Sequence, residues 1–266
     1  MSQLDKLVTA VSQSSKYQHI SPALIQRVGA DELAKRRSYK EAVKATKNKL
    51  HQVGGAYQDS KIDYDKALSA LKTAVGDVAA QQNVLLEIMR LHTSTRERLW
   101  ILDDFYAEVL AGLPPIHSVM DIACGLNPLA RSWMPLADKA TYLAYDIYAD
   151  MIAFLGDYFA LASIPGNAEV RDVVAAPPTE PVDLALLLKT LPVLAQIDKT
   201  AVSRILDSLQ AKYLLISFPA KSLGGRQKGM VQHYEAQFAG WIAGRRWDVA
   251  RFTFENELAF LVETGI

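Results

Sequence analysis

Hydrophobic and polar positions follow different patterns in the two parts of the chain. The first hundred residues lack short apolar runs and are rich in Ala, Lys, Gln, Glu and Leu, which is typical of helices. Ser21 followed by Pro22 fits the start of one helix, and Gly54, Gly55 and Gly76 are expected breaks between helices. This part is therefore predicted to be helical throughout.

Beyond residues 112–115 (GLPP), short apolar runs alternate with segments of helix length. This alternation predicts β-α-β units and a mostly parallel sheet, and two final runs separated by residues 255–257 predict an antiparallel hairpin. The prediction is an α/β, Rossmann-like fold with seven strands, in two domains: residues 1–110 (helical) and 111–266. The expected strands are Ser118–Ala123, Tyr142–Ile147, Ala168–Val173, Leu184–Leu188, Tyr213–Phe218, Val249–Phe254 and Leu258–Val262.

Charge is balanced over the whole chain but unevenly distributed along it. The 266 residues hold 29 Lys and Arg against 29 Asp and Glu, which by itself argues against a nucleic-acid-binding protein. From residue 35 to residue 51, however, seven basic residues face one acid. Arg36, Lys40, Lys44 and Lys47 recur at helical spacing, so they predict a basic stripe on one helix face. A stripe of this kind binds RNA phosphates or is a solvated face, and the pattern leaves both open.

Other features narrow the class of protein. A single cysteine excludes an internal disulfide and a cysteine-based zinc site. The N-terminus has no long apolar core, and no apolar run approaches 18 residues. We therefore expect a cytoplasmic protein without membrane contact.

Acidic residues stand at the ends of three successive predicted strands. Asp121 and Asp146 end the first and second strands, and Asp172 ends the third. Ligands of doubly wound sheets bind beyond these strand ends, where a carboxylate can take ribose hydroxyls or an amine. Each acid could instead cap a helix or a turn. Only Gly125 is present in the loop after the first strand, so the glycine-rich fingerprint of dinucleotide-binding folds is missing.

Four segments together resemble one family: HTSTRERL (residues 92–99), DIACGLNPLA (121–130), LALLLKTLP (184–192) and SFPAKSLGGRQKGM (217–230). They are similar to signature segments of the aminoglycoside-resistance 16S rRNA (guanine-1405-N7) methyltransferases, which are class I methyltransferases dependent on S-adenosylmethionine. The resemblance extends from about residue 16 to the C-terminus. It implies methyl transfer to a guanine in helix 44 of the 30S subunit, without a metal ion, by a protein expected to be a monomer.

The resemblance also implies roles for individual residues. Arg98 would hold the cofactor carboxylate, and Cys124 is interpreted as a packing residue rather than a nucleophile. No catalytic general base is expected, because N7 of guanine carries no proton. The implied cofactor contacts are Arg98, Asp121, Ala123, Gly125, Asp146, Ile147, Asp172, Val173, Lys189 and Leu191. The implied RNA contacts are Arg36, Lys40, Lys44, Lys47, Lys221, Ser222, Arg226, Lys228, Met230 and Tyr234.

Two alternatives remain at this point. One is a class I methyltransferase acting on another RNA site or, against the basic stripe, on a small molecule. The other is a non-catalytic rRNA-binding protein that kept the fold, which the three acids at the strand ends disfavour.

Overall fold

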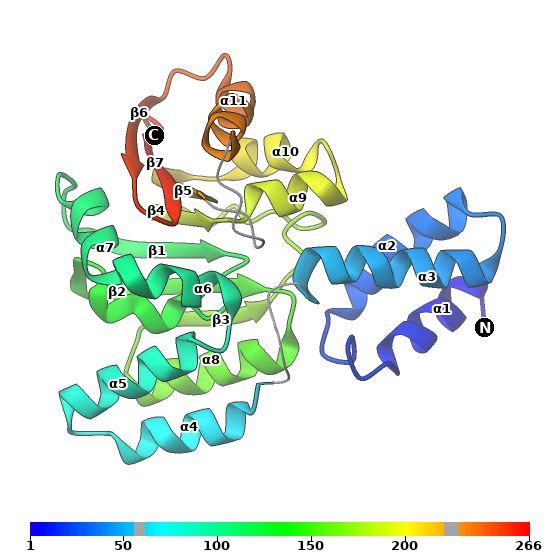
Figure 1. Ribbon diagram of the computed structural model, residues 1–266, viewed down its shortest axis with the longest axis horizontal. Helices are drawn as coiled ribbons and strands as arrows, with labels where there is room; N and C mark the ends of the chain where they lie inside the picture. The colour runs from blue at the N-terminus through cyan, green and yellow to red at the C-terminus, as the bar shows by residue number, and fades with distance from the viewer. Residues whose placement is uncertain (56–61, 221–228) are drawn as a thin grey trace.

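A seven-stranded sheet forms the centre of the computed structural model, which describes residues 1–55, 62–220 and 229–266 (Figure 1). The strand order is β3-β2-β1-β4-β5-β7-β6, and only the pairs that include β7 are antiparallel. The predicted seven-stranded sheet with a C-terminal antiparallel hairpin is therefore confirmed. The strands are β1 (Ile116–Ile122), β2 (Leu136–Asp146), β3 (Gly166–Val170), β4 (Val182–Leu188), β5 (Ala211–Pro219), β6 (Asp248–Thr253) and β7 (Glu257–Glu263).

Both faces of the sheet are covered by helices. Along β4, Leu184 and Leu186 face one apolar cluster while Ala185 and Leu187 face the other, because successive side chains of a strand point to opposite faces. This explains why the run reads as continuously hydrophobic rather than alternating. The helices on the first face are α4 (Tyr64–Thr73), α5 (Val78–Met89), α7 (Leu102–Leu110) and α8 (Ala149–Leu161). Those on the second face are α9 (Leu191–Ile197), α10 (Ala201–Ser208) and α11 (Met230–Ile242).

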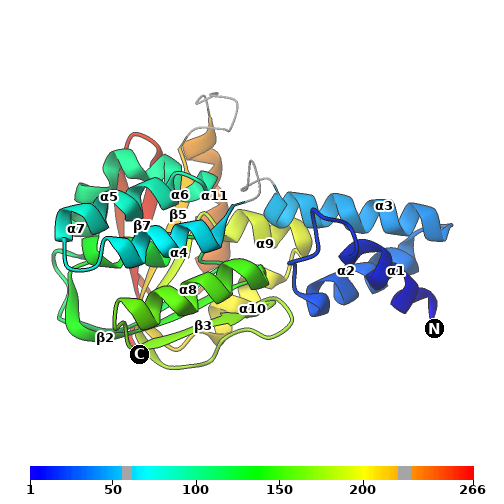
Figure 2. The same ribbon diagram turned by 90° about the horizontal axis from the view of Figure 1, so that it is seen from below.

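The helices that precede the sheet form two groups. Helices α1 (Gln3–Ser12), α2 (Pro22–Lys35) and α3 (Tyr39–Leu50), with the π-helix η1 (His51–Gly55), form a lobe at one end of the sheet, which we call the N-terminal lobe (Figures 1 and 2). Helices α4, α5 and α7 lie beside the sheet instead, on the side that also carries α8 (Figures 1 and 2). Sequence alone did not separate these groups, because both are amphipathic and helical.

Short elements connect the helices to the strand ends. Helix α6 (Thr93–Arg98) and the 3₁₀-helix η2 (Leu99–Ile101) lead into α7, and the 3₁₀-helix η3 (Asn127–Trp133) follows β1. Gly76 lies between α4 and α5 with φ +93°, as its predicted role as a break requires. Within the described ranges, no helix is both long and apolar enough to cross a membrane.

Candidate functional site

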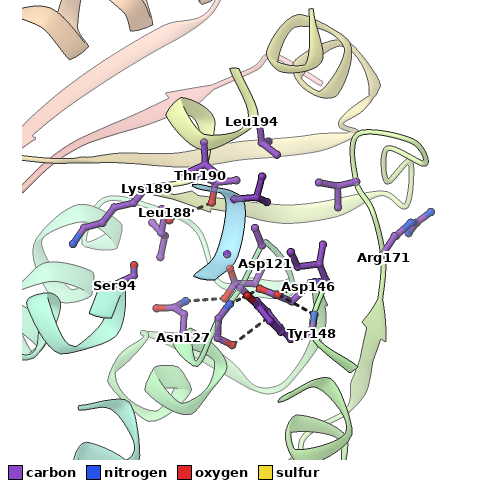
Figure 3. A pocket seen from close by; sticks show the side chains of 18 of the residues that line it. Ser94, Asp121, Asn127, Asp146, Tyr148, Arg171, Leu188, Lys189, Thr190 and Leu194 are labelled. Atoms are coloured by element: carbon purple, nitrogen blue, oxygen red, sulfur yellow. Dashed lines mark hydrogen bonds between the residues drawn. The ribbon is translucent and has the colours of Figure 1, made fainter. Parts of the chain in front are cut away.

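A cavity lies at the carboxyl ends of β1 and β4, where the strand order reverses (Figure 3). Crevices at this position of a doubly wound sheet are where ligands bind. The cavity holds about 890 Å³ of space, part of which opens to solvent. Nine of the ten predicted cofactor contacts line it: Arg98, Asp121, Ala123, Gly125, Asp146, Ile147, Asp172, Val173 and Lys189.

The loop after β1 brings backbone, rather than side chains, up to the cavity. Ala123 and Gly125 have φ +53° and +52°, in the left-handed region. A Cβ atom on Gly125 would lie 2.8 Å from the His92 ring, so only glycine fits between the loop and that ring. Cys124 is buried in this loop, and burial raises the pKa of its thiol well above the usual range. Its neutral thiol is consistent with a packing role.

Asp121 is a buried carboxylate held by two side-chain donors. The Asn127 amide donates to its Oδ2 at 2.8 Å (Figure 3), and the Tyr142 hydroxyl donates to the same atom at 2.7 Å. Burial raises the pKa of Asp121 to about 7, although these two hydrogen bonds and the nearby Arg98 act in the opposite direction. A cation entering the cavity would favour the ionised form.

Asp146 is held by backbone groups instead. Its carboxylate accepts hydrogen bonds from the N–H groups of Gly125 (2.9 Å), Ile147 (2.6 Å) and Tyr148 (3.3 Å). Burial raises the pKa of Asp146 even though all three bonds lower it. These bonds orient the carboxylate at the end of β2, beside the Gly125 loop.

Arg98 faces the cavity but already has a carboxylate partner. Its Nη2 donates to Glu257 Oε1 at 2.6 Å, its Nε also contacts Glu257, and its Nη1 donates to the Asn127 side-chain oxygen at 2.9 Å. These bonds use three of the five N–H groups of a guanidinium. Burial raises the pKa of Glu257, but Arg98 and Lys189 more than offset this, so the pKa lies below its usual value.

Glu257, which lies 159 residues from Arg98, was not predicted from the sequence. The segment at residues 255–257 reads as the turn of a hairpin, and no local signal marks one of its acids as buried. The structure places Glu257 at the start of β7, fully buried.

The end of β4 carries a second buried cation. Lys189 has φ +59°, an unusual conformation for a residue other than glycine, and its Nζ lies 2.7 Å from Glu97 and 3.5 Å from Glu257. The next residue, Thr190, donates its hydroxyl to the Ile122 carbonyl at 3.2 Å and so links β4 to β1. The predicted contact Leu191 does not line the cavity, because its side chain is fully buried in the second apolar cluster.

Asp172 lies two residues beyond the end of β3, rather than within it. Its carboxylate is paired with Arg27 of α2, at 2.7 and 3.1 Å, and it accepts the N–H of Val174 at 3.1 Å. Val173 is buried and lines the cavity beside it.

Several cavity residues were not predicted. His92 and Ser94 belong to the HTSTRERL segment and Asn127 to DIACGLNPLA, so the signal that marked their neighbours also covers them. Cys124, Leu188 and Thr190 likewise lie within the segments DIACGLNPLA and LALLLKTLP. The remaining residues come from the lobe, the loops after β2 and β3, and α9, and their packing into one cavity depends on tertiary structure. They are Leu24, Val53, Gly54, Tyr148, Arg171, Val174, Val193, Leu194 and Ile197. Among the described residues, no group of three or more His, Cys, Asp or Glu side chains is arranged to hold a metal ion.

The predicted basic stripe is present only in part. Lys40, Lys44 and Lys47 lie on α3 and line one shallow groove together with Tyr39. Arg36 does not belong to this face: α2 ends at Lys35, Arg36 is extended with φ −102° and ψ 149°, and α3 begins only at Tyr39. Its guanidinium pairs with Glu32 at 2.7 Å. The prediction of a four-residue helical stripe was wrong at Arg36, because the helical spacing runs across a break.

Four of the predicted RNA contacts lie outside the described residues: Lys221, Ser222, Arg226 and Lys228. Met230 is partly buried and begins α11. The Tyr234 ring stacks on fully buried Phe218 with centroids 5.2 Å apart, so it contributes to packing on the sheet.

Comparisons with known proteins point to one group. Residues 13–261 match the family described as "Ribosomal RNA methyltransferase (FmrO)". The chain is 36% identical to a 16S rRNA (guanine(1405)-N(7))-methyltransferase of Micromonospora rosea, over 97% of this chain and 96% of that protein. Its fold is similar to that of the 16S rRNA methyltransferase RmtF in complex with S-adenosyl-L-homocysteine (TM-score 0.86, 30% identity, 99% of both chains). It is also similar to the 16S rRNA methylase RmtB (TM-score 0.81, 28% identity, 98% of both chains).

Proposed function

The chain belongs to the ribosomal RNA methyltransferase family, and on that premise we propose that it methylates N7 of guanine 1405 in 16S rRNA. The methyl donor is S-adenosylmethionine, and the by-product is S-adenosylhomocysteine. The observation that carries the proposal is the cavity at the β1–β4 strand ends, which brings Arg98, Asp121 and Asp146 together. Methylation at this position would protect the ribosome against aminoglycosides such as gentamicin and kanamycin.

The residues around the cavity fit this cofactor. Its ammonium group is a partner for the buried Asp121, and its ribose hydroxyls are partners for Asp146 at the end of β2. Arg98 keeps two N–H groups beyond those bonded to Glu257 and Asn127, enough for a second carboxylate. The close approach of backbone at Ala123 and Gly125 leaves space for the methionine chain.

We assign the remaining contacts on the same basis. Ile147 flanks the ribose, Asp172 and Val173 face the adenine, and Lys189 lies beside the reacting methyl group. Leu191, two residues after Lys189, is buried in the core and supports this part of the cavity wall from within. The cofactor supplies a methyl group on a positively charged sulfur. Since N7 of guanine presents a lone pair and no proton, the chain needs to align the base and needs no general base.

The substrate contacts form the second part of the proposal. Lys40, Lys44 and Lys47 of α3 contact rRNA phosphates, and Arg36 adds a contact from the segment between α2 and α3. Met230, Tyr234 and the basic residues of the segment 221–228, which lies outside the described residues, contribute to binding of the target guanine. The guanine leaves its stack to reach the cavity. The protein acts in the cytoplasm as a metal-free monomer on the 30S subunit.

The test is direct modification of ribosomal subunits. Purified protein, 30S subunits from an unmethylated strain and labelled S-adenosylmethionine are incubated together, and the rRNA is mapped by primer extension and mass spectrometry. A single 7-methylguanosine at position 1405 is expected. Methylation at another nucleotide, or cofactor binding without any transfer, would contradict the proposal, and subunits already methylated at position 1405 serve as the control.

A further inference from the structure

One ion pair ties helix α2 of the N-terminal lobe to the far side of the cavity. Arg27 Nε donates to Asp172 Oδ2 at 2.7 Å, and Arg27 Nη2 donates to Asp172 Oδ1 at 3.1 Å. The Asp172 side chain is 5% exposed and that of Arg27 is 24% exposed. Two parallel bonds from one edge of a guanidinium fix the orientation of the carboxylate as well as its distance.

The lobe also supplies part of the cavity wall. The Ser21 N–H donates to the Ile147 carbonyl at 2.8 Å, directly after Asp146. A Cβ atom on Gly54 would lie 2.5 Å from the Tyr148 hydroxyl, so the lobe lies against this loop without space for a side chain. The lobe residues that line the cavity are Leu24, Val53 and Gly54.

Asp172 sets the path of the chain that follows β3. Its carboxylate accepts the Val174 N–H at 3.1 Å, and its carbonyl accepts the Ala176 N–H at 2.9 Å. These bonds hold the backbone so that Val173 and Val174 line the cavity. A carboxylate this deeply buried is costly without a cation, and without its partner it would turn toward water and draw the loop with it.

We propose that Arg27 is a positioning residue for the cofactor site, and that the N-terminal lobe thereby completes the adenine end of that site. Arg27 does not line the cavity, so it acts through Asp172. The inference rests on the proposed function, because it takes Asp172 and Val173 as the adenine contacts. It implies that the lobe carrying the rRNA-docking lysines and the cofactor pocket form one binding unit.

Calorimetry with S-adenosylhomocysteine on the full-length protein tests the proposal. We expect Arg27→Ala to raise the Kd by about tenfold, and Arg27→Lys to recover part of the loss because it restores a charge with one bond. The double variant Arg27→Ala/Asp172→Asn should bind no more weakly than Asp172→Asn, since both changes remove one interaction. Arg251→Ala is the control: it breaks an arginine–carboxylate pair, with Glu235 at 2.6 Å, away from the cavity and should leave the Kd unchanged.

Kinetics separate positioning from general damage. Arg27→Ala should raise the KM for S-adenosylmethionine while kcat at saturating cofactor stays within about twofold, because the loss is in binding that precedes the chemical step. Equal affinity in wild type and Arg27→Ala would overturn the inference and leave the proposed function standing. Wild-type protein without measurable affinity would instead overturn the proposed function. If a melting curve shows that Arg27→Ala does not fold, Arg27→Gln keeps the length of the side chain without its charge, and wild-type affinity in that variant overturns the inference.

Discussion

The carboxyl group of Asp121 couples the loss of a proton to the binding of a cationic ligand. Its carboxyl is buried beneath the loop after β1, and burial raises its pKa to about 7. At neutral pH roughly half of the molecules therefore carry a proton there. A positively charged ligand binds better to the ionised form, so its binding would lower the pKa and release the proton.

We predict that S-adenosylmethionine affinity rises as the pH rises through 7. At pH 6, about one unit below this pKa, only about a tenth of the molecules have Asp121 ionised, so the Kd should be roughly tenfold weaker than at pH 8. Calorimetry between pH 6 and 8 in buffers of different ionisation enthalpy measures both the affinity and the proton release. Asp121→Asn should bind weakly at pH 8 and show no such dependence; a flat profile in the wild type would refute the role of Asp121.

Arg98 pairs with buried Glu257 and also lines the cavity, so its removal should lower both the stability of the protein and its affinity for the cofactor. Arg98→Ala removes the arginine that pairs with buried Glu257 at 2.6 Å and leaves it with Ser217 and, at 3.5 Å, Lys189, so we expect a loss of about 3–5 kcal/mol in the free energy of unfolding. Asp146→Asn keeps one acceptor oxygen but places an NH2 group against a backbone N–H donor of the loop, so we expect a smaller loss of stability than for Arg98→Ala and a loss of about 1–3 kcal/mol of cofactor affinity.

Denaturant unfolding and calorimetry on the two variants compare these effects. Arg98→Met combined with Glu257→Gln should recover most of the lost stability without recovering methylation, because no charge is then buried alone. An unfolding midpoint for Arg98→Ala equal to that of the wild type would show that the pair with Glu257 is not structural.

At the scale of elements, α3 is a separate basic surface. Lys40, Lys44 and Lys47 share one groove with the Tyr39 ring, and the helix begins at a Ser38 cap whose hydroxyl accepts the Glu41 N–H. Its length of 12 residues corresponds to about 18 Å. None of the three lysines lines the cofactor cavity, so their charge can be changed without touching the cofactor.

We predict that replacing Lys40, Lys44 and Lys47 with Glu abolishes tight 30S binding. The slope of log affinity against log salt should fall in magnitude by about 1 for each phosphate that the variant no longer binds. S-adenosylhomocysteine affinity should remain at the wild-type value, which also shows that the variant is folded. Gentamicin resistance at the wild-type level in cells carrying the triple variant would contradict a docking role for this face.

At the scale of the molecule, the proposed docking helix and the cavity belong to one chain but lie apart. Figures 1 and 2 show α3 running outward from the cavity end of the sheet, so the lysines and the cavity lie at different places along the protein. Such an arrangement suits a folded RNA surface recognised by shape and phosphate contacts.

We therefore predict a strong preference for the assembled subunit. A hairpin with the sequence of helix 44 lacks the rest of the subunit surface that we propose α3 binds, so it should be methylated at least about tenfold more slowly than 30S subunits. Single-turnover rates at saturating cofactor measure the difference. The α3 triple Glu variant should lose rate on 30S subunits but not on the hairpin; equal wild-type rates on both substrates would rule out recognition beyond helix 44.

The fold was largely predictable because it depends on local patterns. Most strands of the sheet are short apolar runs between helix-length segments, which period and length predict, whereas β3 (GNAEV) is polar and largely exposed, so its bounds were predicted less well. Asp121 and Asp146 were identifiable for a related reason: the carboxyl ends of neighbouring parallel strands meet at one edge, so acids there converge whatever the rest of the chain does. The segments around Arg98 and Lys189 carried the family resemblance in the same local way.

Only the tertiary structure decided which charges meet. Glu257 pairs with Arg98 across 159 positions and Arg27 pairs with Asp172 across 145, and nothing in the local sequence distinguishes these residues from solvated ones. Arg36 shows the converse: its spacing fits the stripe, but the backbone breaks between α2 and α3. Periodicity reports which face of an element is apolar, whereas partners depend on how the elements pack. The sequence therefore determined the sheet and its acidic edge, and packing determined how the N-terminal lobe closes the site.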